Sequence, residues 1–260
     1  MRRLRVGDQA VHSEAPEAGR YHAPILLLPG LFQSFLCWRA VTSVLAHRGW
    51  EIYCLARTML DQDGEELITE DDGWERAQEK VVQIAGELGD KVIIFGADVG
   101  AALALSVADK TTPLALALMA PAHPQQLASS YRASQGLLGR LRPGTPGKPV
   151  AAPAALAKQA AFEQFVVDEP GRLLAELGDV PNLTGTSIPR IVYAPLNDPL
   201  VDTDASSAFG QEPGARLAPT RLDGRWWASD PGSVADEIHR FLILTLGDRI
   251  VEFPDEILED

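Results

Sequence analysis

Asp98 lies at the centre of the segment whose residue types and spacing could do chemistry. The run from Gly96 to Gly100 has the pattern G-x-Nu-x-G, with Asp98 at the position of the reactive residue. An apolar run from Val92 to Phe95 precedes it and predicts a strand covered on both faces, and residues Ala101 to Ala108 favour a helix. We therefore predict a sharp strand-to-helix turn, a nucleophile elbow, that holds Asp98 in a strained conformation between very small neighbours.

Composition favours one large α/β domain, or one domain with a small insertion, because the 260 residues are 46% apolar. The formal net charge of −13 excludes a nucleic-acid partner, since phosphate binding needs a basic face. Cys37 and Cys54, the only cysteines, are expected to be buried thiols in a reducing compartment. No signal peptide and no run long enough to cross a bilayer is recognised, so we expect a cytoplasmic protein without membrane contact.

Strand and helix patterns alternate along the chain, which predicts a mostly parallel sheet of roughly eight strands flanked by helices. Strands are expected at 23–28, 50–55, 92–95, 114–119, 188–194 and 216–222, with an edge hairpin in 1–23, and helices at 34–47, 72–88, 101–108 and 232–246. Residues 122–186 are rich in Ala, Pro, Gly and Leu and are predicted to form a small helical lid. Residues 1–121 and 187–260 then form the core.

Chemically useful residues follow several of these strands. Pro29-Gly30, Asp98, His123, Asn197-Asp198 and Gly224-Arg225 all come at or just after a predicted strand end. The carboxyl ends of parallel strands meet at one edge of a sheet, where ligands bind in open α/β sheets. We therefore expect these five turns to converge on one site.

The chain resembles the α/β-hydrolase superfamily over nearly its whole length, and most of all its epoxide hydrolase and haloalkane dehalogenase branch. The resemblance depends on Asp98 in G-x-D-x-G, on Trp38-Arg39 following Pro29-Gly30, and on Asn197-Asp198-Pro199 as an acid turn. It implies that Asp98 is the nucleophile and Asp198 the acid of the triad. It also implies an oxyanion hole made by the backbone N–H groups of Leu31 or Phe32 and of Val99.

Arg225 departs from this pattern, because the family has its catalytic histidine at that position. Arginine stays protonated at neutral pH and cannot activate the water that would cleave an aspartyl ester. Leu31 and Val99 replace the halide-binding residues of the dehalogenases, and Phe32 replaces a proline. Tyr131 is the only tyrosine in the predicted lid, so a pair of epoxide-opening tyrosines is incomplete.

Each of the remaining site residues has two possible roles. Burial of Asp98 favours its neutral form and a neighbouring Arg225 its ionised form, so the pair is either acid–base machinery or, with Asp198, an ion-pair relic. His123 either reaches Asp98 or a substrate, or is solvated at the lid hinge. Trp226 and Phe32 either line an apolar pocket or belong to the core. His239, in the last predicted helix, is expected at the surface.

Three functional classes follow. The first is a non-hydrolytic enzyme, a lyase, isomerase or cyclase, that uses Asp98 for acid–base chemistry on an apolar small molecule, possibly of secondary metabolism. It would need no cofactor and no metal, because no clustered ligand spacing is present. The second is a hydrolase with an Asp98 nucleophile, with His123 standing in for the missing histidine. The third is a non-catalytic binding or scaffold protein. A monomer and a homodimer are both compatible with the sequence.

Overall fold

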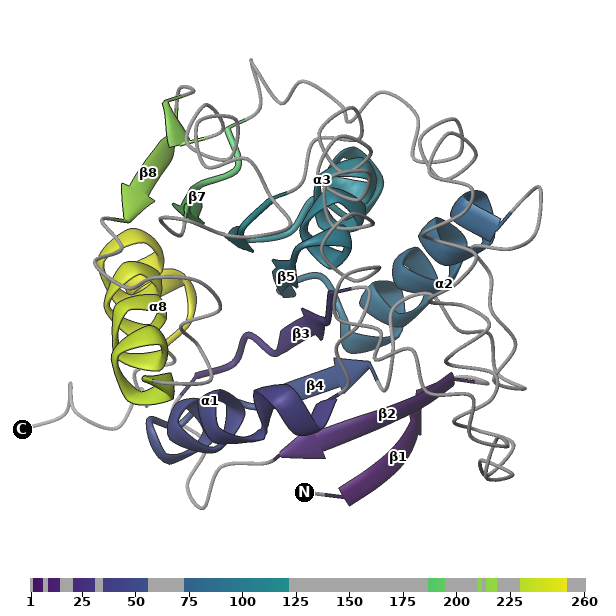
Figure 1. Ribbon diagram of the computed structural model, residues 1–260, viewed down its shortest axis with the longest axis horizontal. Coiled ribbons are helices and arrows are strands. Elements are labelled where there is room, and N and C mark those ends of the chain that lie inside the picture. The colour runs from purple at the N-terminus through teal and green to yellow at the C-terminus, as the bar shows by residue number, and fades with distance from the viewer. Residues whose placement is uncertain are drawn as a thin grey trace, which may run out of the picture.

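A single eight-stranded sheet forms the centre of the molecule (Figure 1). The computed structural model describes residues 2–6, 9–14, 21–30, 35–55, 73–121, 187–194, 210–211, 214–218 and 230–251. The strands are β1 (Arg2–Val6), β2 (Gln9–Glu14), β3 (Ile25–Leu28), β4 (Ile52–Leu55), β5 (Ile93–Ala97), β6 (Ala115–Met119), β7 (Arg190–Tyr193) and β8 (Ala215–Ala218). Their order across the sheet is β1-β2-β4-β3-β5-β6-β7-β8.

Six of these strands, β3 to β8, run parallel to one another. The edge hairpin expected at the start of the chain is β1 and β2, and β2 joins the sheet antiparallel to β4. The predicted α/β class and mostly parallel eight-stranded sheet are therefore confirmed. The carboxyl ends of β3 to β8 all lie at one edge, which is where the candidate site was expected.

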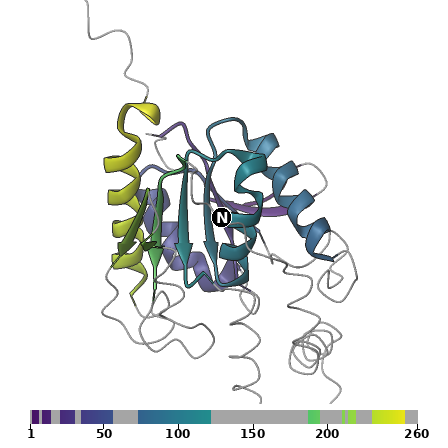
Figure 2. The same ribbon diagram turned by 90° about the horizontal axis from the view of Figure 1, so that it is seen from above.

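Helices cover both faces of the sheet (Figure 2). They are α1 (Phe35–His47), α2 (Gly73–Leu88), α3 (Val99–Thr111) and α8 (Pro231–Leu246), followed by the short 3₁₀ helix η3 (Gly247–Arg249). The buried side chains of α2 and α3 share one core with one face of the strands, and those of α1 and α8 share a second core with the other face. Because each face of the sheet is covered by a core, the central strands are apolar throughout.

Strand β3 shows how the sequence specifies this arrangement. Leu26 and Leu28 belong to the core under α2 and α3, and Ile25 and Leu27 belong to the core under α1 and α8. Successive side chains of a strand point to opposite faces, so an unbroken apolar run has both faces buried. All four side chains are at most 1% exposed.

Helix α8 carries His239, which was expected at the surface. It is partly exposed there, and its Nδ1 also accepts a hydrogen bond from Trp50 Nε1 over 3.1 Å, a contact that the sequence did not predict. The periodicity of α8 places residue 239 beside the buried stripe, and Trp50 fills the space next to it. Cys54 is buried as expected, whereas the side chain of Cys37 lies outside the described part of the chain.

Some predicted segments cannot be compared with the structure. The lid at 122–186, and the end of the last predicted strand at 219–222, lie outside the described residues. Among the helices that are described, none combines the length and the apolar character needed to cross a bilayer.

Candidate functional site

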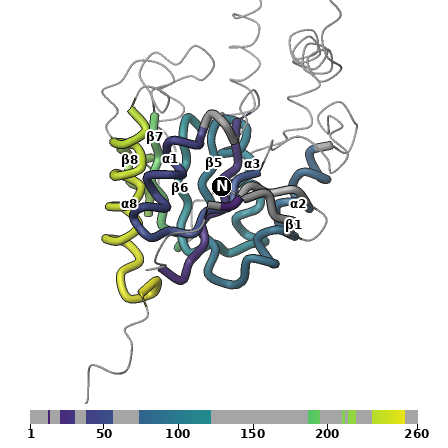
Figure 3. Tube along the Cα trace, turned by 90° about the horizontal axis from the view of Figure 1, so that it is seen from below, coloured from purple at the N-terminus to yellow at the C-terminus, as the bar shows by residue number. Residues whose placement is uncertain are grey.

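Asp98 occupies the turn between β5 and α3, directly after Ala97 and directly before Val99. Figure 3 shows these two elements side by side. The backbone angles of Asp98 are φ 54° and ψ −120°. A positive φ with this ψ is sparsely populated by residues other than glycine, and such a conformation costs on the order of 1–3 kcal/mol. The strained strand-to-helix turn predicted from the G-x-D-x-G spacing is present.

Gly96 and Gly100 make this turn possible because neither position has room for a side chain. A Cβ on Gly100 would lie 2.7 Å from the carbonyl oxygen of Pro29 and 2.8 Å from the carbonyl carbon of Leu28. A Cβ on Gly96 would lie 2.6 Å from the Cα of Ala101. The first turn of α3 therefore rests directly on the backbone at the end of β3, and only glycine allows that approach.

Backbone hydrogen bonds fix Asp98 at the carboxyl edge of the sheet. Its N–H donates to the carbonyl oxygen of Met119 in β6 over 2.9 Å, and its own carbonyl accepts from the N–H groups of Ala101 and Ala102 in α3. The next link along this edge is the Ala120 N–H, which donates to the carbonyl of Tyr193 in β7 over 2.8 Å. Asp98 is thus tied to the ends of neighbouring strands as well as to the helix that follows it.

The Asp98 side chain is only 4% exposed, and it lies at the N-terminus of α3 without capping the helix. The first N–H groups of an α-helix have no carbonyl partner inside the helix, and Val99 provides the first of them in α3. The helix N-terminus carries a partial positive charge that favours an ionised carboxylate or another anion nearby. This arrangement can hold a carboxylate in a water-poor place and stabilise negative charge that develops on a bound oxygen.

Three strands next to Asp98 end a few residues before other predicted site residues in the sequence. Gly30 follows β3, Pro121 follows β6 and Ala194 follows β7, and all three are buried at the same edge. The remaining predicted site residues lie outside the described residues, and they are Leu31, Phe32, His123, Tyr131, Asp198, Arg225 and Trp226. Of the predicted site, the structure therefore describes Asp98 and Val99, and the roles and contacts of the others stay predictions.

Tyr193 is a polar residue at this edge that the sequence pattern did not single out. It ends β7 opposite Met119, is 1% exposed and belongs to the core under α1 and α8. Burial, and to a smaller extent the Glu237 carboxylate, raise its pKa well above the ordinary value of 10. The phenol therefore stays neutral. Its position inside an apolar strand is the only sequence signal that could have marked it.

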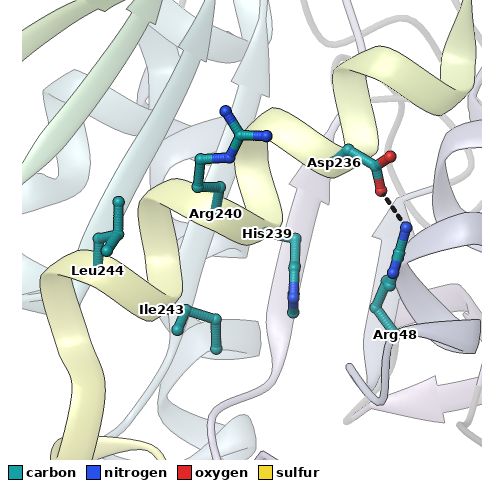
Figure 4. A pocket seen from close by; sticks show the side chains of 6 residues that line it. All are labelled: Arg48, Asp236, His239, Arg240, Ile243 and Leu244. Carbon is teal, nitrogen blue, oxygen red and sulfur yellow. Dashed lines mark hydrogen bonds and ion pairs between the residues drawn. The ribbon is translucent and has the colours of Figure 1, made fainter.

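Two surface pockets that are lined entirely by described residues lie away from Asp98. One, of about 310 Å³, lies between the end of α1 and α8 (Figure 4) and is lined by Arg48, Asp236, His239, Arg240, Ile243 and Leu244. The other, of about 520 Å³, is lined by residues at the amino ends of β3 and β4, such as Tyr21, Pro24 and Glu51, and by Glu87 and Leu88 at the end of α2. No group of three or more metal-binding side chains is found in the described ranges.

Comparisons with known proteins give a consistent picture of the fold. No family model matches the sequence, and no curated protein matches it in sequence. Solved structures do match. An esterase from Exiguobacterium antarcticum has a TM-score of 0.61 at 13% identity, over 90% of this chain and 95% of that one. An alpha/beta hydrolase from Sphaerobacter thermophilus has a TM-score of 0.57 at 19% identity, over 90% and 96% of the two chains.

A laboratory-evolved variant of potato epoxide hydrolase is a further structural neighbour. Its TM-score is 0.56 at 14% identity, over 93% of this chain and 98% of that one. Likenesses at such low identity bear on the fold alone. Taken with the strand order and the strained turn between β5 and α3, they show that this chain has the α/β-hydrolase fold.

Proposed function

We propose that this protein is an α/β-hydrolase-fold enzyme in which Asp98 does acid–base chemistry on an apolar small molecule, as a lyase, isomerase or cyclase. The observation that carries the proposal is the φ of 54° at a carboxylate that is 4% exposed. The strained backbone opposes folding. Glycine would form the same turn without strain, so folding alone does not account for an aspartate there.

The chemistry follows from what surrounds the carboxylate. Ionised Asp98 would take a proton from a carbon next to a substrate carbonyl, and the electron pair would move to the carbonyl oxygen to give an enolate. The Val99 N–H at the N-terminus of α3 would donate to that oxygen, with a second donor from Leu31 or Phe32 in the segment after Gly30. The protonated Asp98 would then return the proton to another carbon, or to a leaving group.

Arg225 supports a reaction that ends without hydrolysis. By sequence pattern it takes the place of the catalytic histidine, and a guanidinium cannot activate water at neutral pH. Its proposed work, together with Asp198, is to orient Asp98 and to favour its ionised form, or to bind a substrate oxygen. His123 is proposed as a second proton donor or acceptor. No cofactor is needed for such a proton transfer.

A second candidate is a hydrolase in which Asp98 attacks an epoxide carbon to form an ester. The aspartate in the elbow favours it, and the fold likeness to an epoxide hydrolase is compatible with it. This reaction also needs a base that delivers water to the ester, and His123 is the residue we would assign to it. An epoxide therefore separates the two candidates, because only the second forms a covalent bond to Asp98.

Two assays with the full chain test the proposal. Proton abstraction is followed by NMR as deuterium uptake from D₂O into a panel of apolar ketones and esters. Covalent attack is followed by intact-mass spectrometry after incubation with styrene oxide. Asp98→Asn should lose uptake, whereas Asp90→Asn, which changes an exposed aspartate before β5, should keep it.

Each other result contradicts the proposal in its own way. An adduct that maps to Asp98 would establish the nucleophilic hydrolase instead. Uptake that is unchanged in Asp98→Asn would remove the catalytic role of this residue. No uptake and no adduct with any probe would favour a binding or scaffold protein.

A further inference from the structure

Trp50 and His239 are joined by a side-chain hydrogen bond that links two distant parts of the chain. Trp50 is fully buried in the turn between α1 and β4, and its Nε1–H donates to Nδ1 of His239 on α8 over 3.1 Å. An indole can only donate, so Nδ1 must be the bare, accepting nitrogen of the imidazole. The ring hydrogen is then on Nε2, and the imidazole is neutral in this arrangement.

Tyr21 completes a cluster of three rings at this corner. Its ring stacks on that of Trp50 with the centroids 4.2 Å apart, and it lies 6.0 Å from the ring of His239. The His239 and Trp50 rings meet edge to face at 6.3 Å. Close by, the His22 N–H donates to the carbonyl of Ile250 over 3.0 Å. The cluster therefore joins α8 and the turn after it to the segment that enters β3.

Charged groups around the imidazole oppose a second proton more than they favour it. Figure 4 shows His239 between Ile243 and Arg48, and the Arg48 guanidinium donates to Asp236 over 2.7 Å. The titratable and charged groups nearby are Tyr21 and His22 before β3, Arg48 after α1, Glu51 before β4, and Asp236 and Arg240 on α8, and His47 precedes Arg48 in the chain. Asp236 is the carboxylate that favours protonation of the ring, and it is shared with Arg48.

Protonation would also break the hydrogen bond itself. A second proton on Nδ1 would place an N–H group against the indole N–H of Trp50, so the two side chains would have to separate. We propose that His239 is a pH-sensitive latch, which holds α8 against the Tyr21–Trp50 corner while the ring is neutral and releases it when the ring is protonated. The latch goes beyond the proposed chemistry at Asp98 and does not depend on it.

The direction of the pH dependence follows from the folded environment. Burial, and to a smaller extent the Arg48 guanidinium, lower the pKa of His239 below its ordinary value of 6.5, and Asp236 offsets part of this. The unfolded or released ring therefore binds a proton more readily than the latched ring. The stability contributed by the latch is complete above about pH 6.5 and is lost as the pH falls from there through the folded pKa.

The first test follows the latch in the wild-type chain by ¹H–¹⁵N NMR. The indole N–H signal of Trp50, identified by its absence in Trp50→Phe, should shift from its hydrogen-bonded position as the pH falls from 7.5 to 5. The signals of the His239 ring should titrate with the same midpoint. A Trp50 signal that stays in place while the His239 ring titrates would overturn the proposal.

The second test compares variants by urea unfolding at several pH values. His239→Asn places an amide oxygen near the position of Nδ1 but cannot titrate, so its unfolding constant should lose the histidine component of the pH dependence between 7.5 and 5. His47→Asn is the matched control, because His47 is an exposed histidine of the same corner whose Nδ1 contacts the carbonyl of Ser43. It should keep the wild-type pH dependence. The same pH dependence in His239→Asn as in wild type would refute the latch, and the NMR test remains decisive if this variant does not fold.

Discussion

Replacing Asp98 by glycine should make the protein more stable while it removes the proposed catalytic carboxylate. The φ of 54° and ψ of −120° cost an aspartate on the order of 1–3 kcal/mol, and glycine adopts them without strain. Glycine loses about 0.4–1 kcal/mol more than alanine in chain entropy on folding. Taking the middle of each range, about 2 minus about 0.7, leaves a net gain of about 1.3 kcal/mol for Asp98→Gly over Asp98→Ala, a variant that also lacks the carboxylate but keeps the strain.

Urea unfolding of wild type, Asp98→Gly and Asp98→Ala measures this gain. The midpoints should differ while the slopes stay equal, because the surface exposed on unfolding is nearly unchanged. Both variants should lose the deuterium uptake proposed above. If Asp98→Gly is no more stable than Asp98→Ala, the turn is not strained in the way its angles indicate, and the argument from strain to function fails with it.

Two further substitutions test the turn and the helix that follows it. Gly100→Ala should destabilise the protein by about 1–3 kcal/mol or more and lower activity, because the new Cβ would meet the backbone of Leu28 and Pro29. Urea unfolding measures the loss of stability, and the uptake assay measures the loss of activity. An unchanged unfolding midpoint would contradict the close approach. Thr112→Gly should stabilise the protein by about 1 kcal/mol with activity unchanged. Thr112 ends α3 in the left-handed region, at φ 40° and ψ 56°, and its N–H, which glycine keeps, donates to the carbonyl of Ala108. A lower melting temperature in calorimetry would refute this.

The fold could be predicted because its central strands share one recognisable sequence pattern. β3 and β5 are short unbroken apolar runs, and such runs are typical of parallel strands with helices on both faces. Strand ends were harder to predict. The pattern extended β7 from Ile188 to Ala194, but the strand is Arg190–Tyr193, because apolar packing continues beyond the paired backbone at both ends.

The candidate site could be predicted only as far as local spacing determines it. Two glycines around Asp98 are enough to predict the turn, because the close approach of Gly96 to Ala101 lies within the turn itself. Contacts between distant segments leave no such signal. The burial of Arg190 and the hydrogen bond from Trp50 to His239 depend on packing between elements that lie far apart in the sequence, so no local pattern predicted either of them.

Helix α8 is synthesised long after the strands that it covers, and this affects how the chain folds on the ribosome. It supplies buried side chains such as Val234, Ile238 and Leu242 to the core that also contains β3 and α1, more than 180 residues earlier in the chain. As the ribosome releases the chain, α1 is the only helix on that face of the sheet in the described part of the chain until α8 emerges. Nascent chains that stop before α8 should therefore expose an apolar sheet face and recruit chaperones, and those that extend past Ile250 should not.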